Sequence, residues 1–168
     1  MKSWITEKEY RQSGGPAVGL GINVPFMAEI KEDCDFRQKL ERLEESLSNS
    51  TPPTNREVAE WLGSLRDDLG TYFALEAFYG YVKQASESIP PLSKQASELA
   101  AEHSELYLQL DRIVELSEQI VYQETTADIT VAQVIQLLSR FRQNFLVHEE
   151  QESALMMELY NRDLGVGD

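Results

Sequence analysis

The sequence predicts an all-α protein folded as an up-down-up-down antiparallel four-helix bundle. From about residue 30 onward, apolar residues recur at spacings of three and four, which is the period of an amphipathic helix. Valine, isoleucine and threonine are too scattered to suggest a sheet. Because the links between the helical segments are only about five to ten residues long, neighbouring helices should run antiparallel.

Caps and breakers divide this part of the chain into four helical segments. Thr54 with Glu57, and Thr130 with Gln133, form capping boxes that open the second and fourth segments. The proline pair at 52–53 separates the first two segments, and Ile89-Pro90-Pro91 ends the second. The expected helices cover roughly residues 30–48, 55–86, 91–122 and 130–161.

The N-terminal part has a different composition. Residues 1–29 alternate glycine and proline with apolar residues in a way that no regular element tolerates. We therefore expect an extended N-terminal strap over residues 1–29, followed by a single bundle domain over residues 30–168. The glycines and prolines concerned are Gly14, Gly15, Pro16, Gly19, Gly21 and Pro25.

Composition excludes several classes of function. The chain has 168 residues, with 29 acidic and 15 basic side chains and a formal charge of −14. Such a charge repels nucleic acid and anionic membrane surfaces, so we expect neither as a partner. Residues 1–20 lack the apolar core of a signal peptide, and no apolar run reaches the length of a membrane span. With Cys34 as its single cysteine, the chain is expected to be an acidic cytoplasmic protein.

Polar residues interrupt the apolar stripes of three predicted helices. Glu76 takes a stripe position in the second helix and His103 in the third, while His148 and Glu152 take two positions in the fourth. Both histidines of the chain thus fall on faces that should point into the bundle.

The interruptions also fall at one level along the bundle. Counting from turn centres near residues 52, 89 and 125, at a rise of about 1.5 Å per residue, brings three pairs to similar heights. The pairs are Asp33 with Tyr72, Glu76 with His103, and His103 with His148. Buried carboxylates need a proton, a partner or a cation. Two explanations remain open: a metal ion held by these residues, or a layer of histidines hydrogen-bonded to carboxylates.

Several stretches on these helices resemble the hemerythrin-like HHE cation-binding domains of bacteria. The similarity covers about residues 30–168, and it implies a four-helix bundle that holds a non-haem di-iron centre. Family roles are oxygen binding, oxygen or redox sensing, and iron handling. The stretches are Leu69-Gly70-Thr71-Tyr72-Phe73-Ala74-Leu75-Glu76, the pair Glu102-His103 with Leu106, His148-Glu149-x-x-Glu152, and Tyr160-Asn161-Arg162-Asp163-Leu164-Gly165.

The resemblance implies a ligand set that this chain keeps only in part. His148 and Glu152 fall on the fourth-helix motif, His103 on the third-helix histidine, and Glu76 on the bridging carboxylate. Three positions where the family carries histidine are filled by other residues that can ligate ferric iron. These residues are Asp33, Tyr72 and Tyr107.

A site with more carboxylate and phenolate should hold iron in its oxidised state, so we do not expect reversible oxygen transport. One hypothesis is a cation-binding domain, with iron, mono- or dinuclear, or zinc, that serves in sensing or metal handling. The other is a metal-free bundle that serves as an interaction or scaffolding module. With nucleic acid and membranes excluded, the expected macromolecular partner is a second copy of the chain or a signalling protein. No nucleophile triad, phosphate loop or cofactor fingerprint is present, so we expect no enzymatic activity.

Overall fold

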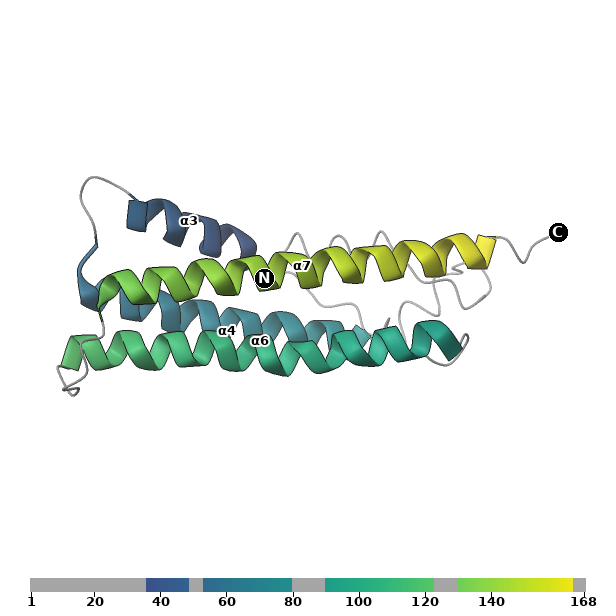
Figure 1. The fold of residues 1–168 in the computed structure, drawn as a ribbon, viewed down its shortest axis with the longest axis horizontal. Helices are drawn as coiled ribbons and strands as arrows, with labels where there is room; N and C mark the ends of the chain where they lie inside the picture. The colour runs from purple at the N-terminus through teal and green to yellow at the C-terminus, as the bar shows by residue number, and fades with distance from the viewer. Residues whose placement is uncertain (1–35, 49–52, 80–89, 123–129, 165–168) are drawn as a thin grey trace, which may run out of the picture.

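Four α-helices account for nearly all of the part of the chain that the structure, a computed structural model, describes (Figure 1). The described residues are 36–48, 53–79, 90–122 and 130–164. The helices are α3 (Phe36–Ser48), α4 (Asn55–Tyr79), α6 (Pro90–Tyr122) and α7 (Val131–Leu164). The all-α prediction is confirmed for these residues. The predicted strap, residues 1–29, lies outside them, as does Asp33.

Both predicted capping boxes are present. The backbone N–H of Thr54 donates to Glu57 Oε2 over 2.8 Å, and the N–H of Glu57 donates back to Thr54 Oγ1 over 3.3 Å. Thr130 and Gln133 make the same reciprocal pair at the start of α7, over 2.8 and 3.4 Å. These bonds satisfy amide groups that the first turn of a helix leaves without partners. The two caps explain why α4 and α7 begin where the sequence predicted.

The helices pack in sequence order and run antiparallel. Contacts between neighbouring helices show this: a later residue on one helix contacts an earlier residue on the next. Arg66 on α4 lies 3.1 Å from Asp111 on α6, and Glu76 lies 3.4 Å from His103. Between α6 and α7, Gln109 contacts Asn144. In Figure 1, α4, α6 and α7 lie side by side as long rods.

The short helix α3 packs against both α4 and α7. Phe36, which is fully buried, contacts the rings of Tyr72, Phe141 and Phe145. Farther along, Glu44 pairs with Arg142 of α7 at 3.0 Å. These contacts fix the first turn of α3 beside the middle of α7.

The apolar core consists of two clusters. The larger one joins all four helices and extends from Leu43 and Val58 to Tyr72 and Leu106. The smaller one joins α6 to α7 through Leu92, Ala96, Leu99, Leu155 and Leu159. Between the clusters, the inward-facing positions are polar: Glu102 and His103 on α6 are half-buried, and His148, Glu149 and Glu152 on α7 are buried. The predicted inward positions Glu76, His148 and Glu152 are buried, which confirms the predicted faces of α4 and α7.

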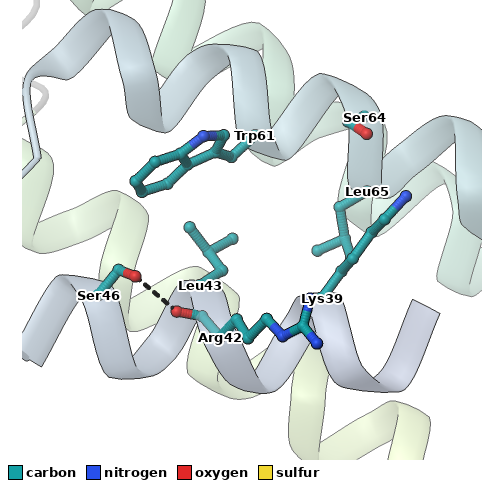
Figure 2. A pocket seen from close by; sticks show the side chains of 7 residues that line it. All are labelled: Lys39, Arg42, Leu43, Ser46, Trp61, Ser64 and Leu65. Carbon is teal, nitrogen blue, oxygen red and sulfur yellow. Dashed lines mark hydrogen bonds between the residues drawn. The ribbon is translucent and has the colours of Figure 1, made fainter. Parts of the chain in front are cut away.

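An open groove of about 300 Å³ lies between α3 and α4, where the indole of Trp61 faces Leu43 (Figure 2). The groove shares no residue with the polar residues between the two clusters. Its lining residues are Lys39, Arg42, Leu43, Ser46, Trp61, Ser64 and Leu65. No helix in the described ranges combines the length and apolar character that crossing a membrane requires.

Two glycines inside α4 should respond differently to alanine. A Cβ atom at Gly63 meets nothing within 4 Å, whereas one at Gly70 lies 3.3 Å from Cε2 of Tyr107. We expect Gly63→Ala to stabilise the protein by about 1 kcal/mol through helix propensity alone. Gly70→Ala should gain less or destabilise, because the Tyr107 ring must move. Urea unfolding of both variants measures the difference, and equal gains would show that the ring yields freely.

The two capping boxes should differ in their response to pH. The hydrogen bonds from the backbone and side chain of Thr54 favour ionised Glu57 and hold its pKa below the ordinary value of 4.5. The stability gained from this cap is therefore present above that value and is lost as the pH falls through the lowered pKa.

We expect Thr54→Ala to cost about 1 kcal/mol at neutral pH and less in acid. Thr130→Ala, whose cap partner Gln133 is uncharged, should cost a similar amount at both. Urea unfolding at about pH 7 and about pH 3.5 tests this. A pH-independent cost at Thr54 would contradict the assignment.

Candidate metal centre

The polar layer predicted inside the bundle exists. Glu76, His148 and Glu152 are at most 1% exposed, and the side chain of His103 is 13% exposed. They come from α4, α6 and α7 and lie between the two apolar clusters. Burying this many ionisable groups costs free energy unless their charges are compensated, so their convergence calls for a physical explanation.

His103, on α6, contacts carboxylates on both neighbouring helices. Its Nε2 lies 3.2 Å from Glu152 Oε1 and 3.4 Å from Glu76 Oε2. The imidazole stacks on the ring of Phe73, with centroids 4.1 Å apart and planes 8° from parallel. This stacking holds the ring so that Nε2 points toward the carboxylates.

His148 is held from both sides. Its Nδ1 lies 2.9 Å from Glu102 Oε2, and its Nε2 lies 3.4 Å from Glu152 Oε1 at an angle that makes no well-directed hydrogen bond. Burial lowers the pKa of His148, but the interactions with Glu152 and Glu102 outweigh burial and raise the pKa above its ordinary value of 6.5.

The two contacts of His148 have a chemical consequence. Since Glu102 accepts a hydrogen bond from Nδ1–H, a neutral imidazole presents its Nε2 lone pair toward Glu152 Oε1. A lone pair facing a carboxylate oxygen is repulsive unless a cation lies between them. Either a second proton on the imidazole or a metal ion can be that cation. Histidine ligands of metals are commonly oriented in this way, through a carboxylate on the other ring nitrogen.

Glu149 adds a third buried carboxylate on the same side of α7. It is 3% exposed and accepts a hydrogen bond from the hydroxyl of Tyr72 through Oε1. Its other oxygen, Oε2, pairs with the guanidinium of Arg37 at the start of α3. The layer thus extends from His148 to the first turn of α3.

Two overlapping groups of donor atoms could hold a metal ion among the described residues. One consists of His103, His148 and Glu152, the other of Glu76, Glu149 and Glu152, and the atoms of each group lie within 4.8 Å of one another. Two ligands about 2.1 Å from a common ion are at most about 4.2 Å apart, so small side-chain rotations would bring either group to bonding distance. The first group, with two imidazoles, suits zinc or iron, while the second offers only oxygen.

Six of the seven sequence-predicted site residues lie in the described part of the chain, and Asp33 lies outside it. Glu76, His103, His148 and Glu152 are brought together, and buried Tyr72 lies beside them with its hydroxyl on Glu149. The ring of Tyr107 instead packs over Gly70 on α4. Ligation of a metal by any of them stays a prediction.

Sequence reasoning missed two members of the cluster, Glu102 and Glu149. Glu149 follows Phe145 by four residues, and Glu102 precedes Leu106 by four, so both lie at the margins of the buried stripes. A wider stripe on each helix would have included them. Each is also the immediate sequence neighbour of a histidine.

Comparison with known proteins adds no family. The chain matches no protein-family model, no characterised protein sequence and no solved structure.

The pH dependence of the metal-free protein should report on His148. A raised folded-state pKa contributes stability that is fully present below the unfolded value near 6.5 and is lost as the pH rises through the raised value. In the presence of a chelator, we expect the free energy of unfolding to fall above about pH 6.5. His148→Gln should remove the part of this slope that His148 contributes, because glutamine does not titrate. Urea unfolding across this range measures the slope, and an identical slope in the variant would contradict the assignment.

Proposed function

We propose that the protein is a hemerythrin-like cation-binding bundle that holds iron or zinc and serves in metal sensing or handling. The observation that carries the proposal is the convergence of His103 Nε2 and His148 Nε2 on one oxygen of buried Glu152, at 3.2 and 3.4 Å. A single ion bound to this oxygen would lie within reach of both imidazoles.

The charge balance supports a cation. Glu76, Glu149 and Glu152 are all at most 3% exposed, and Arg37 is a cation that pairs with one of them. A divalent ion compensates buried carboxylates more completely than shared protons do, and it releases those protons when it binds. The bundle supplies the rigid helices on which such a site depends.

The ligand set supports sensing or handling over reversible oxygen transport. Only two histidines exist in the chain, and carboxylates supply the remaining donors. Carboxylate ligands stabilise the higher oxidation state of iron, which opposes reversible oxygenation. The proposal includes no catalytic turnover, and it treats residues 30–168 as one domain that follows a strap over residues 1–29.

A metal-free scaffold is the second candidate. It is favoured by the contacts that the two histidines already make with Glu76, Glu102 and Glu152. Apolar side chains on the surface, such as Val147 and Leu108 at 53% and 63% exposed, would provide contact area for a partner.

Metal analysis distinguishes the two candidates. We expect the chain, incubated with Zn²⁺ or anaerobic Fe²⁺ and separated from free metal, to retain a stoichiometric ion. His148→Ala combined with Glu152→Ala should abolish retention, whereas Glu150→Ala, on the exposed face of α7, should not. At metal concentrations 100 times the Kd, bound metal should stabilise the wild type by about 2.7 kcal/mol. A folded wild type without stoichiometric Zn, Fe or Mn by elemental analysis would support the scaffold instead.

A further inference from the structure

Arg37 is a cation that contacts the group of three carboxylates, Glu76, Glu149 and Glu152, through Glu149. It is the second residue of α3, and its guanidinium pairs with Glu149 Oε2. Its side chain is 47% exposed while that of Glu149 is 4% exposed, so the arginine reaches a buried carboxylate from the rim. Arginine stays protonated at any pH a protein tolerates, so this positive charge is permanent.

Glu149 is engaged at both of its oxygens. Oε1 accepts the hydroxyl hydrogen of Tyr72, and Oε2 pairs with Arg37. A metal ion that used Glu149 would have to compete with both groups. Glu152, by contrast, faces the two histidines, whose ring nitrogens are common metal ligands.

The backbone of Arg37 is anchored by the residue before it. Its neighbour Phe36 is fully buried against Phe141 and Phe145, which hold the first turn of α3 on α7. The packing of Phe36 therefore places the backbone of this turn beside α7, and the ion pair holds the guanidinium at Glu149.

We propose that Arg37 determines the nuclearity of the centre: it serves as the second cation, so that the bundle binds a single metal ion at His103, His148 and Glu152. The guanidinium compensates Glu149, and a second ion in the group of Glu76, Glu149 and Glu152 is excluded by charge repulsion and by the loss of a carboxylate ligand. This inference rests on the proposed metal-binding function.

The test is the metal content of three arginine variants, with Zn²⁺ as the probe. We expect the wild type to retain one Zn²⁺ per chain and Arg37→Gln to retain two. Arg37→Lys, which keeps the charge, should retain one. Arg142→Gln is the matched control, because it breaks another pair between α7 and α3, the 3.0 Å contact with Glu44, away from the histidines. It should retain one. Elemental analysis after gel filtration and native mass spectrometry give the counts.

A second measurement does not depend on Arg37. Because Glu149 lies outside the proposed ligand set, Glu149→Gln should retain one Zn²⁺ per chain. Its affinity for Zn²⁺ should stay within about tenfold of the wild type, which is the smallest loss typical when a residue that hydrogen-bonds to a metal ligand is replaced. Glu152→Gln should lose the ion.

The outcomes separate the two proposals. A folded wild type that retains no metal overturns the proposed function. A wild type with two ions, an Arg37→Gln variant with one, or loss of the ion in Glu149→Gln overturns the role of Arg37 while metal binding stands. Far-UV circular dichroism and thermal unfolding establish that each variant is folded before its metal is counted.

Discussion

The buried carboxylate of Glu152 is the constraint on which the arrangement of the layer depends. Two imidazoles from different helices approach the same oxygen, so α6 and α7 must hold a common register at this level. A buried charge is costly in free energy unless neighbouring groups compensate it. Removing one compensating partner destabilises the fold by more than the intact pair contributes to stability. The positions of His103, His148 and Glu76 follow from this one group.

Apolar packing on both sides keeps the layer in place. The larger cluster ends at Phe73 and Leu106, and the smaller one begins at Leu99 and Leu155. Phe73 belongs to the apolar core and also stacks on His103, so the same ring that fills the bundle orients a polar group. The groove beside Trp61 shares no residue with this layer.

Helix α3 contacts the polar layer through its first two residues. Phe36 contributes apolar packing and Arg37 contributes charge, at adjacent positions of one helical turn. Because successive helix residues point about 100° apart, one can be buried while its neighbour reaches the rim. The tyrosine that stands in a histidine position of the resembled family, Tyr72, donates to the carboxylate that Arg37 compensates. Glu149 therefore connects Tyr72 on α4 to Arg37 on α3.

The sequence alone determined the helices, their caps and the inward polar positions. Spacing of three and four residues and the Thr54 and Thr130 boxes are local signals, and local signals can be followed along a chain. Only the tertiary structure decided which groups share a proton or a charge. Glu149 and Glu102 lie at stripe margins, where burial depends on the helix packed opposite, and Tyr107 turned toward Gly70 because that glycine leaves room for a ring. The role of Arg37 depends on its contact with Glu149, more than a hundred residues away in sequence, which no pattern within α3 or α7 specifies.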